Sequence, residues 1–121
     1  MINELLQKIE NPAARKNLGA LLNNGFSLSQ DHIKELLSGG IESRYLQVFP
    51  TVKESQIIKN INLDLSEAEN LLLIVEGDPG LHWKATELVN AVTEKSSAKV
   101  IWNFHPSTRS RHILKVVALS Y

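Results

Sequence analysis

The chain has 121 residues, of which 43% are hydrophobic, and this length and apolar content predict one compact domain with a substantial core. Its 13 basic and 13 acidic side chains cancel, so it lacks the positive excess that drives binding to nucleic acid or to an anionic membrane. It contains no cysteine, which excludes disulfides, thiolate metal sites and a thiol nucleophile.

The start of the chain indicates where the protein works. Met1-Ile-Asn-Glu-Leu-Leu has neither the basic region nor the continuous apolar stretch of a secretion signal. No apolar run approaches the length of about 20 residues that spans a bilayer. We therefore expect a soluble cytoplasmic protein whose partner is neither membrane nor nucleic acid.

Before Gly39-Gly40, apolar residues recur at the spacing of short amphipathic helices. Asn11-Pro12 separates the first helix from the second, Gly25 follows the end of the second, and Ser27 or Ser29 is suited to cap the third. The apolar stripes are Ile2, Leu5, Leu6 and Ile9, then Ala14, Leu18, Leu21 and Leu22, and finally Ile33, Leu36 and Leu37. Three such stripes need a common surface to bury.

After the glycine pair, the pattern alternates between strands and helices. Leu71 to Val75 is apolar at every position, which predicts a central strand covered on both faces. The predicted strands span residues 43–49, 71–75, 99–104 and 112–121. The predicted helices carry Val52, Ile57, Ile58 and Ile61, with Thr51 as cap, and then Leu81, Ala85, Leu88, Val89 and Val92.

These elements place the fold in the α/β (α+β) class, with three N-terminal helices followed by a β-α-β-α-β-β mixed sheet. We expect the first three strands to be parallel and the last to return as a hairpin partner. Residues 1–121 should form a single domain, with a helical part at 1–40 and a mixed-sheet part at 41–121.

Asn60–Ser66 is a short acidic lead-in, and Glu76–Leu81 is a glycine-containing loop before a helix. Phe104-His-Pro106 then leads through a polar turn to the strand Ile113–Leu119. In these motifs, residues 43–121 resemble the C-terminal domain of the tubulin-like bacterial division protein FtsZ. The resemblance implies the same strand and helix order and, in that family, a domain that docks on its neighbours.

The departures from the family concern its chemistry. The chain has nothing similar to the family's phosphate loop, Gly-Gly-Gly-Thr-Gly-Thr-Gly, nor to the acidic loop that completes a neighbour's GTP site. No GTPase residue is therefore carried over. In the family, one sheet face rests on a long helix shared with the GTPase domain, and here we expect the three N-terminal helices to cover that face.

The loop Glu76–Gly80 lies between a strand and a helix, where open α/β sheets bind ligands. We favour a tight turn instead, because Asp78 suits the helix dipole and would repel an anion. A small-molecule enzyme using this loop, with His82 beside Asp78 or Glu87, remains an alternative.

The four histidines lack the spacing that would bring two of them to one metal ion. They are His32, His82, His105 and His112. The sequence also offers no set of nucleophile, base and orienting group. We predict no catalytic residue, no metal and no cofactor, and thus a protein that is not an enzyme.

The aromatic and arginine residues suggest a surface for another protein. Trp83, next to His82, lies beside an apolar helix stripe and should be partly exposed, as interface anchors often are. Arg109 and Arg111 should form a cationic hairpin tip for an acidic partner. Trp102 and Phe104, by contrast, lie on a strand face expected to be core.

These features predict a non-enzymatic protein-binding module, and the resemblance suggests docking on a tubulin-like or other filament-forming protein. A second hypothesis is a small immunity protein or antitoxin that neutralises a toxin by binding it. A helix-turn-helix is disfavoured because Asp31 and Glu35 make the third helix acidic.

Overall fold

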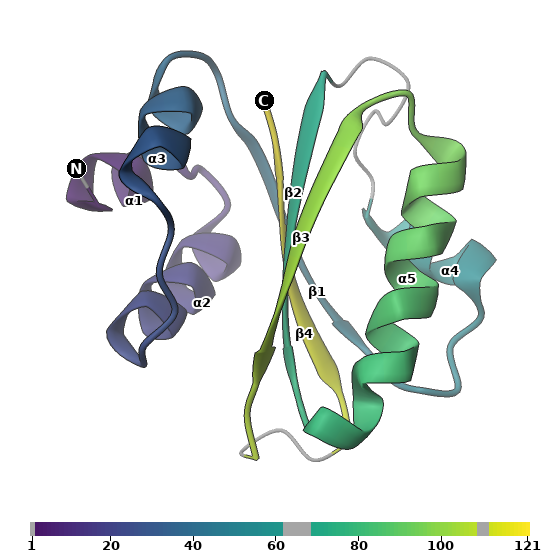
Figure 1. Ribbon diagram of the computed structural model, residues 1–121. Coiled ribbons are helices and arrows are strands. Elements are labelled where there is room, and N and C mark those ends of the chain that lie inside the picture. The colour runs from purple at the N-terminus through teal and green to yellow at the C-terminus, as the bar shows by residue number, and fades with distance from the viewer. Residues whose placement is uncertain (1, 62–68, 109–111) are drawn as a thin grey trace.

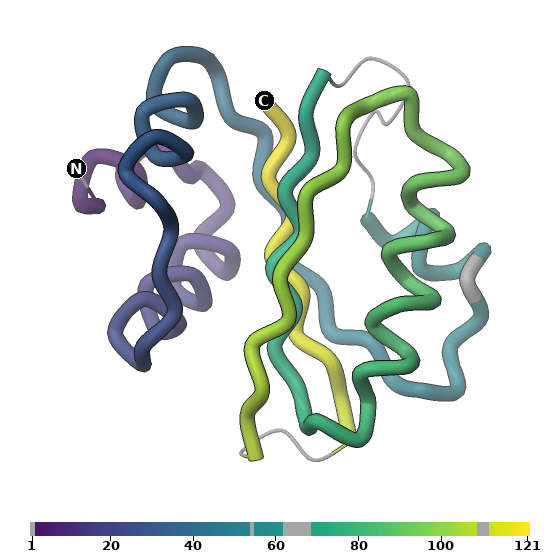
Figure 2. The backbone as a smooth tube through the Cα atoms, viewed as in Figure 1, coloured from purple at the N-terminus to yellow at the C-terminus, as the bar shows by residue number. Residues whose placement is uncertain are grey.

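The computed structural model describes residues 2–61, 69–108 and 112–121. Figure 1 shows three layers, with the N-terminal helices on one face of a sheet and two further helices on the other. The backbone trace in Figure 2 leaves the first helical layer once, where it enters the first strand. The α/β class and the order of elements are as predicted.

Local sequence signals set the ends of the first three helices, α1 (Ile2–Lys8), α2 (Pro12–Asn23) and α3 (Gln30–Leu37). The Asn11 side-chain oxygen accepts a hydrogen bond from the Ala14 amide at 2.9 Å. Gly25 has a φ of 99°, which permits the turn after α2. Ser29 caps α3 by accepting from the His32 amide at 3.1 Å. These bounds confirm the helices predicted from the apolar stripes.

The second part of the chain forms a four-stranded sheet in the order β1-β4-β2-β3. β2 and β3 are parallel, and β4 runs antiparallel to both β1 and β2. The elements are β1 (Glu42–Val48), α4 (Glu54–Ile61), β2 (Asn70–Gly77), the short 3-10 helix η1 (Pro79–Leu81), α5 (His82–Lys95), β3 (Lys99–Pro106) and β4 (Leu114–Ser120). The first three strands are parallel in direction, as expected.

The predicted hairpin between the last two strands is wrong. β4 lies between β1 and β2, and β3 pairs with β2 alone. The burial of the two strands explains this order, because residues 116–119 of β4 are buried on both faces, whereas Lys99 and Asn103 of β3 are exposed. A strand with two buried faces requires an interior place, and a half-exposed strand suits an edge.

Two smaller predictions also need correction. α4 begins at Glu54, so Thr51 and Val52 lie in the preceding turn and Thr51 does not cap the helix. Trp102 and Phe104 do face the second helical layer, but they are only partly buried. Their place on the edge strand leaves one side of each ring without a neighbouring strand.

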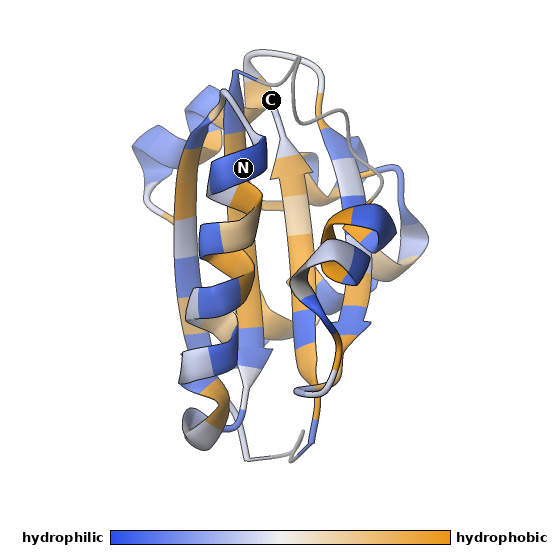
Figure 3. Cartoon of the chain, turned by 90° about the vertical axis from the view of Figure 1, so that its right-hand side faces the viewer, coloured by the Kyte–Doolittle hydropathy of each residue, from blue (hydrophilic) through white to orange (hydrophobic). Residues whose placement is uncertain are grey.

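β2 divides its side chains between two cores. Leu71, Leu73 and Val75 pack with α4 and α5, whereas Leu72 and Ile74 pack with α1, α2 and α3. Figure 3 shows the apolar strands behind α5, whose outward side is largely hydrophilic. The interior position of β2 is thus confirmed, and the N-terminal helices supply the cover expected of them.

The C-terminal residue Tyr121 joins this helical layer to the sheet. Its hydroxyl lies 2.8 Å from Nε2 of His32 on α3. Burial raises the pKa of the Tyr121 phenol above its usual value, and the Glu35 carboxylate adds to the shift. The folded protein therefore holds the phenol proton more tightly than the unfolded chain does.

Deleting residues 1–40 should abolish cooperative unfolding, because it exposes the face of the sheet that carries Leu72 and Ile74. Circular dichroism during thermal unfolding, with the full chain as control, measures this. A soluble fragment 41–121 with an unchanged midpoint would show that the helices are a separate domain.

Tyr121→Phe should be less stable than the parent near neutral pH by about 0.5–1.5 kcal/mol, because it loses the bond to His32. The parent's raised phenol pKa stabilises it fully below about pH 10, and this contribution is lost as pH rises through the folded pKa. The stability difference should therefore shrink above pH 10, as measured by urea unfolding at several pH values. A difference that grows instead would contradict the assignment.

Candidate protein-binding surface

The loop between β2 and α5 is a tight turn, as favoured from the sequence. Oδ1 of Asp78 accepts a hydrogen bond from the Gly80 amide at 2.8 Å, and the Leu81 amide donates to the Asp78 carbonyl at 2.8 Å. Asp78 therefore caps η1, which leads directly into α5. The turn fixes the direction in which the first residues of α5 point.

Trp83 lies in the first turn of α5 and is 52% exposed, as predicted. The next residue, Lys84, is only 4% exposed although it carries a charge. Its Nζ lies 5.9 Å from the centroid of the Trp83 ring, within the range of a cation–π contact. Lys84 thus supports the indole from the side of the protein.

Lys84 also ties α5 to the turn that follows β1. Its Nζ donates a hydrogen bond to the Val52 carbonyl at 2.6 Å and another to Oε2 of Glu87 at 3.3 Å. A buried ammonium group is stable only when it is paired and hydrogen-bonded, and these two contacts meet that requirement. The first turn of α5 and the β1–α4 turn are therefore held together.

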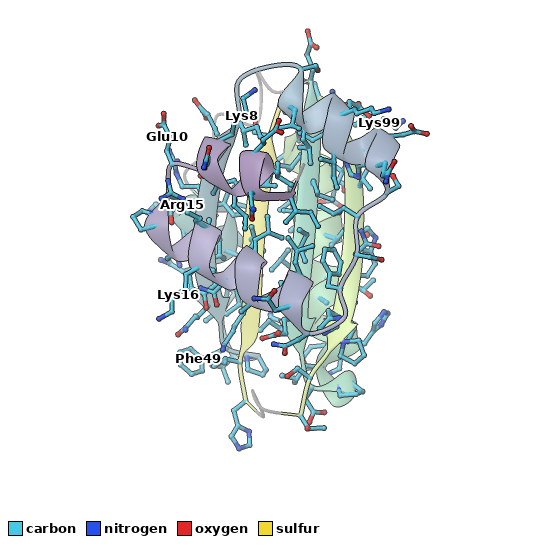
Figure 4. The ribbon with its side chains drawn as sticks, turned by 90° about the vertical axis from the view of Figure 1, so that its left-hand side faces the viewer. Lys8, Glu10, Arg15, Lys16, Phe49 and Lys99 are labelled. Carbon is cyan, nitrogen blue, oxygen red and sulfur yellow. The ribbon has the colours of Figure 1, made fainter. Side chains whose placement is uncertain are left out.

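The tied turn carries a second exposed aromatic residue, Phe49, which is 53% exposed. The Val52 amide donates to the Phe49 carbonyl at 3.1 Å, so both residues belong to the same turn. Figure 4 shows Phe49 at the lower left of the molecule. We call Phe49, Trp83 and the turn Pro50–Lys53 the aromatic rim.

A shallow pocket of about 460 Å³ lies within the aromatic rim, lined by Pro50 to Lys53, Ser55 and Lys84. The sequence identified Trp83 as a surface position but not Phe49, which lies at the end of the predicted strand 43–49. In the structure β1 ends one residue earlier, at Val48. The sequence did not identify Lys84 either. The signal available for Phe49 was Pro50, which cannot donate to a strand ladder and marks the end of pairing.

Of the other predicted surface positions, the described one, His82, does not join the aromatic rim. His82 packs its ring against those of Trp102 and Phe104, with centroid distances of 5.8 and 5.1 Å, and so faces β3. Arg109 and Arg111 lie outside the described residues. A role for these three residues in protein binding stays a prediction.

The described part of the chain holds no group of three histidine, aspartate or glutamate residues close enough to bind a metal ion. None of its described helices is long and apolar enough to cross a membrane. Asp78 and Glu87, the carboxylates considered as partners of His82, contact the Gly80 amide and Lys84 instead.

The fold is similar to part of several tubulin-like proteins. CetZ2 of Haloferax volcanii, in a GTPγS-bound protofilament, gives a TM-score of 0.60 at 19% identity, covering 91% of this chain and 38% of CetZ2. FtsZ of M. jannaschii gives 0.58 at 15% identity, covering 79% of this chain and 32% of that one. An empty FtsZ dimer from M. jannaschii gives 0.56 at 17% identity, covering 98% and 43%. No protein-family model matches the sequence, and no curated protein is similar to it.

At 15–19% identity these similarities show the fold alone. This chain spans about two-fifths or less of the length of the proteins it matches. Residues 43–121 are about two-thirds of the chain, so an alignment covering 91% or 98% also includes much of the N-terminal helical part. The similarity of fold therefore extends beyond residues 43–121 into the N-terminal helices.

Lys84→Met should loosen the aromatic rim, because the methionine keeps the apolar stem but cannot donate to the Val52 carbonyl. We expect a loss of about 1 kcal/mol in the free energy of unfolding, together with faster hydrogen exchange at the Val52 amide. Lys53→Met, an exposed lysine of the same turn, is the matched control. Equal exchange rates in the two variants would show that Lys84 does not hold the turn.

Proposed function

We propose that this protein is a non-enzymatic cytoplasmic module that docks on a tubulin-like, filament-forming protein through the aromatic rim. The observation that carries the proposal is the pair of half-exposed aromatic residues, Phe49 and Trp83, presented from two turns that Lys84 holds together. Large aromatic residues that stay exposed on a fixed support are typical anchors of protein interfaces.

The energy available at the aromatic rim fits this role. A Phe or Trp side chain buries about 150–250 Å² when fully covered, so each half-exposed ring leaves about 100 Å² for a partner to cover. At about 25 cal/mol per Å², covering one ring contributes about 2.5 kcal/mol to binding, which is the size of an interface hot spot. Because the turns are already fixed, less of this energy is lost in ordering side chains.

The similar structures support the partner class. CetZ2 was solved as a protofilament and FtsZ as a dimer, so proteins with this fold form contacts with one another. The resemblance of residues 43–121 to the C-terminal domain of FtsZ suggests that this chain corresponds to the docking part of such a protein. Exposed Lys53 in the aromatic rim favours an acidic surface on the partner.

The contacts of the proposed catalytic groups support a non-enzymatic role. Asp78 is used as a turn cap and Glu87 pairs with Lys84, so neither carboxylate orients His82. The His82 ring instead lies against two aromatic rings of β3. In nucleophile–base sites the base is typically oriented by a third group, and neither carboxylate takes that part here.

The proposal is tested by co-sedimentation with the tubulin-like proteins encoded in the same genome, each purified and assembled into filaments. The parent protein should pellet with one of them in a saturable way. Trp83→Ala and Phe49→Ala should each weaken binding at least about ten-fold, which corresponds to 1.4 kcal/mol. Ile2→Ala is the matched control, because Ile2 is a large apolar residue 45% exposed on α1, away from the aromatic rim.

Thermal unfolding of each variant separates binding from folding, since exposed side chains contribute little to stability. If both aromatic variants fold and bind as tightly as the parent, the aromatic rim is not the docking surface. If the parent pellets with none of the tubulin-like proteins, the proposed class of partner is wrong.

A further inference from the structure

A second site lies on the opposite face of the sheet from α5 and is independent of the proposed docking function. A pocket of about 500 Å³ opens between α2 and the carboxyl ends of β2 and β3. Figure 1 shows α2 alongside the lower half of the sheet, where these strands end. In parallel sheets, this end of the strands is where ligands commonly bind.

Strand register brings three polar side chains together in this pocket. Glu76 of β2 lies opposite His105 of β3 and also opposite Lys115 of β4. All three alternate with residues of the core beneath α2, so they project from the same face of the sheet. The row across the strands is therefore ammonium, carboxylate and imidazole, and all three line the pocket.

The two charges of this row form a long ion pair without a hydrogen bond. Nζ of Lys115 lies 4.0 Å from Oε1 of Glu76, which exceeds the length of a charge-assisted hydrogen bond, about 2.8 Å. Both side chains are largely covered, at 32% and 18% exposed. Among the described residues neither side chain makes a hydrogen bond, and their charged atoms are not fully buried, so both are accessible to a ligand.

A ligand that carries both charges would satisfy both groups at once. In an α-amino acid the ammonium nitrogen and a carboxylate oxygen are about 2.7 Å apart, as standard bond lengths dictate. An ammonium on Glu76 and a carboxylate on Lys115, each at about 2.8 Å, complete a four-membered ring of alternating charges. The gap of 4.0 Å between the protein groups is the remaining side of that ring.

A ligand with only one charge fits less well. A simple anion would be attracted by Lys115 but repelled by the carboxylate of Glu76. A simple cation would be attracted by Glu76 but repelled by Lys115. The rest of the wall suits a small organic molecule, since Leu21 and Val117 are apolar and Asn24 is polar. The pocket volume falls within the usual range for such ligands, about 300–1,000 Å³.

We propose that this pocket binds a free α-amino acid, with the ammonium group on Glu76 and the carboxylate on Lys115. His105 borders the same site from β3. Its ring is held by an edge contact with Phe26, with centroids 6.1 Å apart. The imidazole thus lies at a fixed position beside Glu76, where it can contact the ligand's side chain.

Isothermal titration calorimetry of the full chain with each of the protein α-amino acids tests the proposal. At least one should bind saturably, with a dissociation constant of about 1 mM or tighter. The N-acetyl and the amide derivatives of the best ligand, which each lack one charge, should bind at least about ten-fold more weakly. Glu76→Gln and Lys115→Gln should produce the same loss.

The matched controls are Glu42→Gln and Lys99→Gln, which change exposed charges at the other end of the sheet and should bind like the parent. Backbone amide shifts in the parent provide a second measurement that needs no variant, and they should move at residues 76, 105 and 115. The proposal is overturned if no amino acid binds saturably, if a singly charged derivative binds as tightly, or if folded pocket variants bind like the parent.

Discussion

The structure depends on the burial of both faces of its interior strands. Every residue from Leu71 to Val75 of β2 is fully buried, and β4 has a similar run from Val116 to Leu119. Covering one such side chain contributes about 1.5–3 kcal/mol. Leaving several of them in water would therefore cost as much as the whole free energy of unfolding of a typical domain, about 5–15 kcal/mol. Two helical layers are therefore required, and the sheet can fold only between them.

This requirement explains where recognition can occur. The faces of the sheet are occupied by α1 to α3 on one side and by α4 and α5 on the other. Groups that contact a partner or ligand must then lie where the strands end, beyond the reach of the apolar cores. The aromatic rim and the pocket around Glu76 both lie at this edge, on opposite sides of the sheet.

Local patterns predicted the elements, but not how the strands pair. The unbroken apolar run of β2 is visible in the sequence, and so are the caps of α2 and α3. The place of β4 is not visible, because its run from Val116 to Leu119 fits a hairpin as well as an interior strand. The crossover from β1 to β2 leaves the width of one strand between them, and only an antiparallel β4 fills it.

The candidate sites depend on the same pairing. Lysines are usually solvated, so nothing marked Lys84 as buried against a carbonyl 32 residues away.

Gly77 links the packing of the sheet to the position of the candidate sites. A Cβ at this position would collide with the Leu114 side chain at the start of β4, so glycine permits β4 to approach the end of β2. In the adjoining ladder, Lys115 lies opposite Glu76. The next residue, Asp78, caps the turn into α5 and so orients Trp83. The strand that carries Glu76 into the pocket thus also begins the turn that presents the indole, so β2 contributes to both candidate sites, one on each side of the sheet.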